Sequence, residues 1–305
     1  MIDESFHIPV LTEEVIQHLL VNRNGNYLDA TSGFGGHTVA ILEQLVNGSL
    51  IATDQDPEAI SYLKSKFKSE RRISIQQARF SELDKLFSAN DFDGILADIG
   101  VSSYQLDTAE RGFSFMKDGP LDMRMDQNIA EDASSWLSNA SENEISSIVW
   151  KYGEERKAKR IAKAIIEARN NFKIKSTKEL AEIILEEVPR RFNDKKHPAT
   201  KTFQAIRIFI NNELEELRLF LDFTSKHLKI GGRACIISFH SLEDRIVKQF
   251  FRDRSRRDPR LSKLPNLADD SSFKLVSKAI KPSDHEININ PRSRSAKLRV
   301  IERIR

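Results

Sequence analysis

Cysteine is almost absent from this 305-residue chain, which contains only Cys235. A single cysteine can form neither an internal disulfide nor a cysteine-cluster metal site, so both are excluded. No other cluster of metal-ligating residues requires an ion. In the apolar run Ala234-Cys-Ile-Ile237, the thiol is expected to be a small buried group in a strand.

Long apolar runs are missing as well. No stretch approaches the roughly 18 consecutive apolar residues of a membrane span. The first residues, Met1 to Ser5, are acidic where a signal peptide carries basic residues. The sequence therefore predicts a cytoplasmic protein. Hydrophobic residues make up 39% and charged residues 30% of the chain, which is typical of a folded protein, and the length favours two domains.

Charge is unevenly distributed along the chain. The net charge is +3, but residues 245–305 contain 17 Lys or Arg against 7 Asp or Glu, which is +10 and leaves −7 for residues 1–244. A basic segment of this kind can neutralise phosphates and so bind nucleic acid in a salt-dependent way. On charge alone, a merely solvated surface is the alternative.

Short apolar runs alternate with helical patterns in the first third of the chain. The expected strands cover residues 27–30, 50–54, 72–75 and 94–98, and the expected helices cover residues 38–46 and 57–67. Such alternation of strands and helices indicates a parallel sheet.

Helical patterns replace strand patterns after Asp98. Capping boxes at Ser141-x-x-Glu144 and Ser176-x-x-Glu179 each precede an amphipathic segment. The chain from about residue 106 to residue 200 therefore resembles an all-α insertion.

Apolar residues then recur every three or four positions over residues 203–221, which predicts one long helix. Gly231-Gly232 is expected to stop the chain after it. Residues 233–239 have the pattern of a buried strand, and Ser241, with Asp244 three residues on, is expected to cap the following helix. Residues 273–280 and 296–302 are expected to close the sheet as a strand pair.

The predicted fold is therefore α/β, with a doubly wound, mostly parallel sheet interrupted by an all-α domain. The sheet domain is predicted to comprise residues 1–105, as its first and ligand-binding part, and residues 201–305, as its second part with the basic C-terminal segment. Residues 106–200 are predicted to form the helical insertion.

A glycine-rich turn, Asp29-Ala-Thr-Ser-Gly33-Phe-Gly35-Gly36-His37, joins the first expected strand to the first helix. Glycines allow the backbone to turn tightly and to approach a ligand closely. Asp54 ends the second strand 21 residues after Gly33, where a carboxylate can accept both hydroxyl protons of an adenosine ribose. The pattern indicates a nucleoside cofactor, with a purely structural turn as the alternative.

The spacing of these glycines is not G-x-G-x-x-G. In addition, the acidic Asp29 just before the turn would oppose a pyrophosphate but suits a ligand with a cationic amino-acid end. Both features favour S-adenosylmethionine over NAD.

Two further residues are candidates for the same site. Phe80 follows the third strand, where its ring could cover an adenine, although a lone aromatic is more often part of the core. Asp98 ends the fourth strand, and the carboxyl ends of central strands form the ligand crevice of such sheets. For Asp98 the alternative is a buried, paired aspartate.

Long motifs are spread over nearly the whole chain. They are His7-x-Pro-Val-Leu with Glu14-Val15, Asp29 to His37, Asp98-Ile-Gly-Val-Ser-Ser with Gln105-Leu-Asp107, Arg111-Gly-Phe-Ser-Phe with Asp118 to Asp126, His197 to Arg207, Ile237 to Lys248, and Asn290 to Val300. Together they resemble the bacterial 16S ribosomal RNA cytosine-N4 methyltransferase family.

The resemblance implies an S-adenosylmethionine-dependent enzyme that methylates the exocyclic amine of one cytidine in the decoding centre of 16S ribosomal RNA, within the small ribosomal subunit. It also implies a Rossmann-like class I methyltransferase fold with a helical insert. The implied cofactor contacts are Gly35, Gly36 and His37 in the turn, Asp54 on the ribose, Phe80 near the adenine, and Asp98 and Gln105 beside the methionine end and the methyl group.

One residue departs from the family pattern. Tyr104 stands where the family usually has proline. Tyrosine frees the φ angle and adds an N–H donor, so the rigidity of this loop is expected to differ.

The exocyclic N4 amine of cytosine is a poor nucleophile, because its lone pair is delocalised into the ring until an acceptor holds its hydrogens. Asp98 and the carbonyls of the following loop are the expected acceptors, and alignment of N4 with the methyl group is the main task. His240 is expected beside the same crevice, where it could orient the base or accept the proton, with helix capping as an equally weighted alternative.

The target cytidine must be unpaired or turned out of its stack to reach such a site. Arginines near the C-terminus are the candidates for holding the RNA phosphates. They are Arg252, Arg254, Arg256, Arg257, Arg292 and Arg294.

Three other readings remain open at this stage. Ser102, His240 and Asp244 could form a hydrolase triad, but the chain has no G-x-S-x-G motif. A nicotinamide-dependent oxidoreductase shares the predicted fold and would bind NAD(H). A non-catalytic RNA-binding assembly factor would bind ribosomal RNA and transfer no methyl group.

Overall fold

The computed structural model describes residues 9–89, 91–190, 197–256 and 271–305. The chain divides into two compact units: unit 1 is Met1–Gly100 with Leu214–Arg305, and unit 2 is Val101–Glu213. The sequence predictions at His7 and Arg257 lie outside the described residues. Within the described ranges, every helix is too short or too polar to cross a lipid bilayer.

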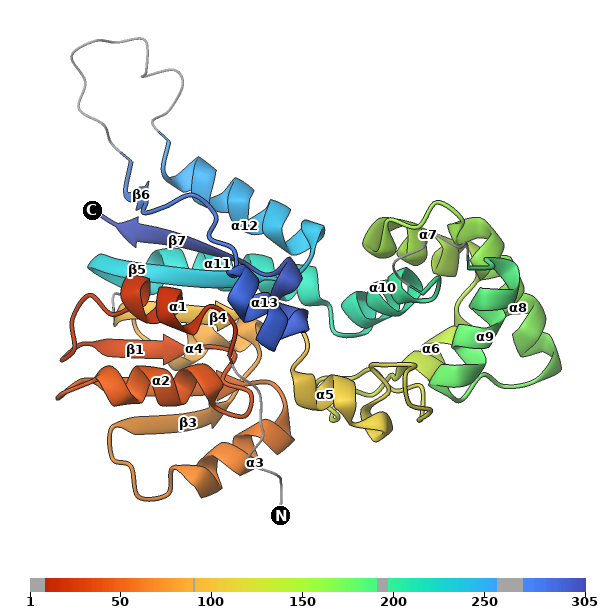
Figure 1. Cartoon of the computed structure of the whole chain (residues 1–305), viewed down its shortest axis with the longest axis horizontal. Helices are drawn as coiled ribbons and strands as arrows, with labels where there is room; N and C mark the ends of the chain where they lie inside the picture. The colour runs from red at the N-terminus through yellow and green to blue at the C-terminus, as the bar shows by residue number, and fades with distance from the viewer. Residues whose placement is uncertain (1–8, 90, 191–196, 257–270) are drawn as a thin grey trace, which may run out of the picture. The chain divides into compact units, whose positions relative to one another are not determined.

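Unit 1 is built around a sheet in which seven strands of the described chain take the order β3-β2-β1-β4-β5-β7-β6 (Figure 1). The first five strands pair in parallel, and β7 pairs antiparallel with both β5 and β6. Their bounds are β1 Asn26–Asp29, β2 Ser49–Asp54, β3 Ile73–Gln77, β4 Phe92–Asp98, β5 Leu228–Ser238, β6 Phe273–Leu275 and β7 Lys297–Arg303. The sheet is a doubly wound, mostly parallel one, so the predicted Rossmann-like fold is confirmed.

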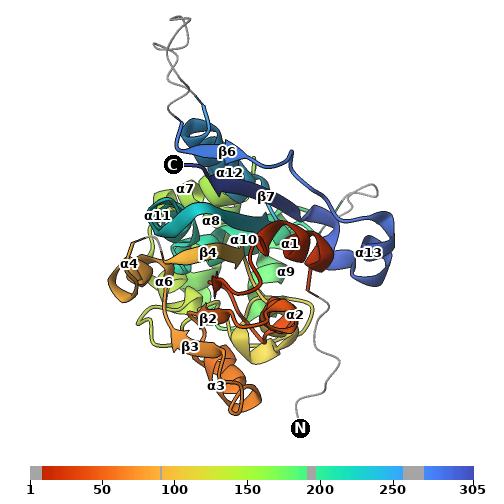
Figure 2. The ribbon, with the colours of Figure 1, turned by 90° about the vertical axis from the view of Figure 1, so that its left-hand side faces the viewer.

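Helices cover both faces of this sheet, as the edge-on view in Figure 2 shows for α1 and α2 on one side and α4 and α11 on the other. The helices of unit 1 are α1 Thr12–Leu19, α2 Gly36–Gln44, α3 Pro57–Lys66, η1 Phe80–Glu82, α4 Leu83–Leu86, α11 Glu213–His227, α12 Ser241–Arg254, α13 Asp284–Ile289 and η3 Pro291–Ser295. Successive residues of β5 alternate between the two cores: Ala234 and Ile236 pack with α11 and α12, and Cys235 and Ile237 with α1 and α2. Cys235 is fully buried, as predicted.

The two glycines predicted to stop the chain before β5 are in fact part of that strand. β5 begins at Leu228, and its register against β4 shifts between Phe92 and Gly94. Gly231 has a φ of 83°, a left-handed conformation that glycine adopts without strain. The glycines therefore accommodate an irregularity of the strand, and the expected stop was wrong.

Unit 2 is helical throughout its regular structure. Its described elements are α5 Ser103–Asp107, η2 Ala109–Arg111, α6 Ala133–Asn139, α7 Glu142–Gly153, α8 Ala158–Asn171, α9 Thr177–Glu187 and α10 Thr200–Ile210. Both predicted helix starts lie where expected, since Ser141 and Ser176 accept hydrogen bonds from the backbone of Glu144 and Glu179. The described contacts form a complete capping box only at the second, where the Glu179 carboxylate also accepts from the Ser176 N–H at 3.0 Å; the Glu144 carboxylate accepts from Nε1 of Trp136 at 3.4 Å instead. Apolar side chains from α6 to α10 form one separate core.

The long helix predicted over residues 203–221 is two helices, α10 and α11, separated at Asn211 and Asn212. Asn212 has a positive φ of 51°. The Asn211 side chain is buried, donates to the Met123 carbonyl at 2.8 Å and accepts from the Met125 N–H at 2.7 Å. Apolar periodicity continues across the break, which is why the pattern alone did not reveal it.

This break also moves a predicted domain boundary. Phe203 and Ile206 of α10 belong to the core of unit 2, so that unit extends to Glu213 rather than to residue 200. At its other end, unit 2 begins at Val101 rather than at residue 106, because Val101 packs against the same core. The boundary between the two units depends on which core each side chain packs into, and the amino-acid composition along the chain does not reveal this packing.

Candidate functional site

Three acidic residues mark the carboxyl edge of the sheet in unit 1. Asp29 ends β1, Asp54 ends β2 and Asp98 ends β4. Because these strands are parallel and β1 lies between the other two, the three ends share one edge. The strand order reverses between β1 and β4, which is where ligands bind in open parallel sheets.

The glycine-rich turn after β1 is attached to the end of β2. Gly33 and Gly35 have positive φ values of 47° and 90°. The Gly33 N–H donates to Oδ2 of Asp54 at 2.8 Å. A Cβ on Gly35 would lie 2.8 Å from Cδ2 of Leu63, so a larger residue would force the turn away from α3. Gly35 thus combines a backbone angle and a close packing contact that favour glycine at this position.

Asp54 combines a fixed position with spare hydrogen-bonding capacity. Its two carboxylate oxygens accept from the backbone N–H groups of Gly33 and Asp56, at 2.8 and 2.9 Å. Desolvation by the surrounding protein raises the pKa of Asp54 to about 6, although these hydrogen bonds act in the opposite direction. Each oxygen has a second lone pair, so both can still accept from the two hydroxyls of a ribose.

Asp29 lies beneath the turn and is fully buried. Burial raises the pKa of its carboxyl, although the positive charge of His37 and hydrogen bonds from Thr38 and Thr31 oppose that shift. The Thr38 hydroxyl donates to Oδ2 of Asp29 at 2.7 Å. Thr31 was not singled out from the sequence, and its position within the glycine-rich turn is the only signal that could have found it.

Asp98 and His37 bring unsatisfied polar atoms together at the start of α2. Nε2 of His37 lies 3.6 Å from Oδ2 of Asp98. Neither ring nitrogen of His37 nor Oδ1 of Asp98 has a hydrogen-bond partner among the described residues. The Asp98 N–H donates to the Thr31 hydroxyl at 2.6 Å, which joins the loops after β1 and β4. Buried polar atoms are normally paired, so this corner is suited to a polar ligand.

Phe80 lies just after β3, as expected, in the short helix η1. Its ring stacks on Phe220 of α11, with centroids 4.4 Å apart and an interplanar angle of 26°. The side chain is only partly buried against the core beside it. This contact accounts for one face of the ring, and the predicted adenine contact remains a prediction.

Gln105 belongs to unit 2, whereas the other predicted cofactor contacts belong to unit 1. Its side-chain oxygen accepts from the Ser102 N–H at 3.1 Å, and its own N–H donates to the Ser102 hydroxyl at 3.1 Å. These bonds form the capping box of α5. Tyr104 lies in the first turn of that helix, where the backbone N–H is not used in the i to i−4 hydrogen bonds of the helix, so proline and tyrosine at this position allow the same helical hydrogen bonds.

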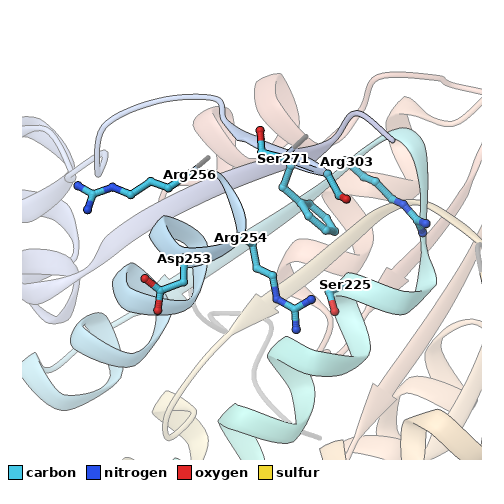
Figure 3. A pocket seen from close by; sticks show the side chains of 8 residues that line it. Ser225, Asp253, Arg254, Arg256, Ser271 and Arg303 are labelled. Atoms are coloured by element: carbon cyan, nitrogen blue, oxygen red, sulfur yellow. The ribbon is translucent and has the colours of Figure 1, made fainter. Parts of the chain in front are cut away.

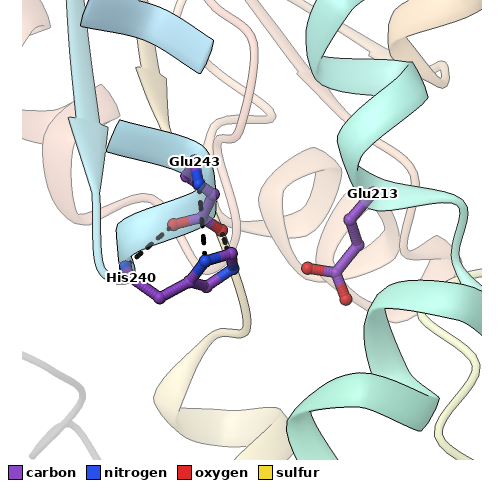
Figure 4. A group of neighbouring side chains, drawn as sticks. All are labelled: Glu213, His240 and Glu243. Atoms are coloured by element: carbon purple, nitrogen blue, oxygen red, sulfur yellow. Dashed lines mark hydrogen bonds and ion pairs between the residues drawn. The ribbon is translucent and has the colours of Figure 1, made fainter. Parts of the chain in front are cut away.

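His240, rather than the predicted Ser241, caps α12. Nδ1 of His240 accepts from the Glu243 N–H at 3.4 Å, and the Glu243 carboxylate accepts from the His240 N–H at 3.2 Å. Nε2 lies 2.9 Å from Oε1 of Glu243 without the alignment of a hydrogen bond. Figure 4 shows the ring of His240 turned toward Glu243. The geometry favours the capping role that the sequence left as an alternative.

Asp244, the other residue in that expected cap, pairs with β7 instead. Its carboxylate accepts from Lys297 at 2.8 Å and from Arg299 at 2.7 Å. Burial alone would raise the pKa of Asp244, but the hydrogen bonds from Arg299 and Lys297 outweigh it and lower the pKa. With Asp244 in these ion pairs and Ser102 in the cap of α5, nothing in the geometry supports a hydrolase triad.

The predicted RNA-binding arginines lie at opposite edges of the sheet. Arg292 and Arg294 are in η3, directly before β7, whose first residues pair with the carboxyl end of β5. α12 starts at the carboxyl edge and runs back along the sheet; Arg252 and Arg254 lie in its last turn, and Arg256 lies two residues beyond its end. Only the first pair therefore lies at the edge that carries Asp98, and the roles of all five remain predictions.

Comparison with known proteins places the chain in a family. The family model described as the MraW methylase family matches residues 4–304. A relative from Xanthomonas euvesicatoria, named ribosomal RNA small subunit methyltransferase H, is 49% identical over 98% of this chain and 89% of its own length. A relative of the same name from Coxiella burnetii is 48% identical over 98% of this chain and 99% of its own.

Among solved structures, an rRNA methylase from Streptococcus thermophilus aligns over 100% of this chain and 99% of that chain, with 11% identity and a TM-score of 0.40, a similarity too low to bear on function. The full-length family match and the identities near 50% are decisive, and they agree with the sheet order and the turn described above. The chain belongs to the MraW methylase family.

Proposed function

We propose that this methylase transfers a methyl group from S-adenosylmethionine to the N4 amine of a cytidine in the decoding centre of 16S ribosomal RNA, expected to be cytidine 1402. The printed name of the relatives, ribosomal RNA small subunit methyltransferase, supports the RNA substrate and the small subunit as partner. The observation that carries the proposal is the carboxyl edge itself, where a glycine turn, a ribose-type carboxylate and unsatisfied polar atoms meet.

The residues at this edge fit the cofactor chemically. Asp54 has lone pairs for two ribose hydroxyls, and Gly33 has open space where a side chain would otherwise stand. The carboxylates of Asp54 and Asp98 give the edge negative character, which suits a ligand that carries an ammonium and a sulfonium group. The unpartnered ring nitrogens of His37 are available to its amino-acid end. A pyrophosphate would meet these same carboxylates and be repelled.

When bound, the cofactor supplies an electrophilic methyl group on a sulfonium that is already a good leaving group. The work left to the protein is therefore orientation and proton acceptance. Asp54 fixes the ribose through its carboxylate. Asp98, at the end of β4, accepts a hydrogen bond from the N4 amine, which localises the nitrogen lone pair, and its unpartnered Oδ1 can accept the proton released on transfer.

The direct test is methylation of small subunits that lack the modification. The purified chain is incubated with these subunits and with S-adenosylmethionine carrying a deuterated methyl group, and the digested RNA is analysed by mass spectrometry. The proposal requires deuterated N4-methylcytidine. Label in another nucleoside would overturn the assignment, binding of RNA with no label at all would indicate an assembly factor, and binding of NAD(H) in calorimetry would indicate an oxidoreductase.

The capping contacts of His240 lead to a first prediction. His240→Asn should keep the stability of the fold and methyl transfer within about threefold, because asparagine is a good helix cap. His240→Ala should lower the free energy of unfolding by about 1 kcal/mol through loss of the cap. Urea unfolding and initial rates check both values. A loss of about 100-fold in transfer in both variants, with the Asn variant fully stable, would instead establish a catalytic role.

A second prediction concerns pH. With the pKa of Asp54 at about 6, affinity for S-adenosylhomocysteine should fall about tenfold between pH 7 and pH 5, as the carboxylate that accepts the ribose hydroxyls is protonated. Calorimetric titrations across this range check the decline. Asp54→Asn should bind weakly and almost independently of pH, and an identical pH profile in this variant would show that another group is responsible.

Stability of the ligand-free chain should respond to Asp54 in the opposite direction. Folding raises the pKa of Asp54 from 3.8 to about 6. The stabilisation of the folded state by this group is therefore fully present below pH 3.8 and is lost as the pH rises through about 6. Lowering the pH from 7 to 5 should therefore weaken the ligand while increasing the contribution of this group to stability.

A further inference from the structure

A hollow of about 420 Å³ lies at the end of unit 1 opposite to the carboxyl edge. Its lining comes from the ends of α11, α12 and β7 and from the start of β6, and comprises Ser225, Asp253, Arg254, Arg256, Ser271, Ser272, Phe273 and Arg303. We call Arg254, Arg256 and Arg303 the amino-edge cluster. Three guanidinium groups and three hydroxyls against one carboxylate make a lining that suits an anion with several oxygens.

Two members of the amino-edge cluster are held in place by the protein. Arg303 donates to the Leu228 carbonyl at 2.7 Å and to the Arg305 carbonyl at 2.8 Å. Arg254 lies over the Phe250 ring, 5.0 Å from its centroid, and its Nη2 is 3.3 Å from Oδ1 of Asp222. Figure 3 shows Ser225 between the guanidinium groups of Arg254 and Arg303. Fixed cations of this kind lose little entropy on binding.

Arg256 differs from the other two. It lies two residues beyond the end of α12, is exposed, and has no acidic partner among the described residues. Basic residues in the last helical turn, such as Arg254, are also explained by the helix dipole. The helix dipole does not explain Arg256, because this residue lies outside the helix. The fold therefore gives no reason for the positive charge of Arg256 at this surface.

The position of this cluster restricts what it can bind. α12 begins at the carboxyl edge and has 14 residues, so its ends are separated by about 20 Å. Stacked nucleotides rise by about 3.4 Å each, so about six of them would be needed to cover that length. The nucleotide that receives the methyl group therefore cannot contact the amino-edge cluster.

We propose that the amino-edge cluster binds backbone phosphates of the RNA substrate in a segment at least about six nucleotides from the target cytidine, or in a neighbouring RNA helix. The inference rests on the proposed function for the identity of the RNA. Its chemistry is sequence-independent, because guanidinium groups and serine hydroxyls contact phosphates rather than base edges. The RNA substrate then contacts unit 1 at both edges of the sheet, so its recognition depends on the folded shape of the RNA.

The test compares two double variants with the same change of charge. Arg254→Gln with Arg256→Gln removes two cations from the cluster. Lys163→Gln with Lys178→Gln is the control, since both lysines are exposed in unit 2 and the ammonium group of each lies near a glutamate one turn further along its own helix. Affinity for the folded decoding-centre domain of 16S RNA is measured by fluorescence anisotropy at a series of KCl concentrations.

For the cluster variant we expect affinity to be about tenfold weaker near 0.15 M salt, and the slope of log K against log salt to fall by about 1.4 to 1.8, which corresponds to two lost phosphate contacts. The control should keep the slope of the unmodified chain. Equal slopes in all three proteins would overturn the proposal.

Two further readouts separate this proposal from the proposed function. Calorimetric affinity for S-adenosylhomocysteine should be unchanged in the cluster variant, which shows that the fold and the cofactor site are intact. If the unmodified chain binds the RNA but methylates no cytidine, the proposed function fails while the slopes still decide whether the cluster binds phosphate.

Discussion

Asp98→Asn is expected to lower the kcat of methyl transfer by about 100-fold or more while leaving affinity for S-adenosylhomocysteine within about threefold. The substitution keeps the size of the side chain but removes its charge and its ability to take up a proton. Oδ1 of Asp98 has no partner among the described residues, so folding depends little on it. Single-turnover rates with small subunits, together with calorimetry of the cofactor product, measure the two quantities separately.

A matched control is available on the same strand. Asp93 lies near the other end of β4, where its carboxylate accepts from Lys229 at 2.7 Å and from the Asn26 N–H at 2.9 Å. Asp93→Asn makes the same chemical change at the amino edge and should affect stability without affecting the rate. If Asp98→Asn transferred methyl at the normal rate, Asp98 would not be the acceptor and the loop carbonyls after β4 would become the leading candidates.

Asp54→Ala should raise the dissociation constant of S-adenosylmethionine by about 100-fold or more. A carboxylate that accepts two ribose hydroxyls contributes about 1.5 to 3 kcal/mol for each charged hydrogen bond, and the substitution also releases the Gly33 N–H from the turn. Calorimetric titration measures the change directly. Because the loss is in ground-state binding, saturating cofactor should restore most of the rate.

Asp56 provides the control for this prediction. It lies two residues further on and caps α3, where its side chain accepts from the Glu58 N–H at 3.0 Å. Asp56→Ala should lower stability by about 1 kcal/mol and leave cofactor affinity nearly unchanged. Similar losses of affinity in both variants would mean that the loop after β2, rather than the Asp54 carboxylate, determines binding.

The sequence predicted the sheet and its acids well, because these depend on short-range signals. A run of alternating strand and helix patterns is enough to specify parallel pairing, and Asp29, Asp54 and Asp98 lie at the strand ends that this pairing brings together. The glycine-rich turn was equally predictable, since Gly33 and Gly35 both adopt positive φ angles, a conformation that glycine favours.

Features that depend on long-range contacts were not predictable in this way. The break between α10 and α11 is stabilised by hydrogen bonds between the Asn211 side chain and the backbone of Met125 and Met123, which lie 86 and 88 positions earlier in the chain. The cap of α12 shifted by one residue, because a histidine nitrogen can replace the usual hydroxyl and the next acid, Asp244, is taken by two cations of β7. The spacing of the arginines also does not show that Arg252, Arg254 and Arg256 lie at the opposite edge, because that depends on the direction in which α12 runs.

Unit 2 is one continuous stretch, whereas unit 1 is assembled from two segments on either side of it. During synthesis on the ribosome, residues 101–213 therefore emerge while β4 still lacks β5, its neighbour in the finished sheet. Until that partner is translated, the strand that ends in Asp98 has an open edge able to pair with other chains. The whole insert is therefore synthesised before β5 can cover this edge of β4, and a stall between these points is expected to leave an aggregation-prone intermediate.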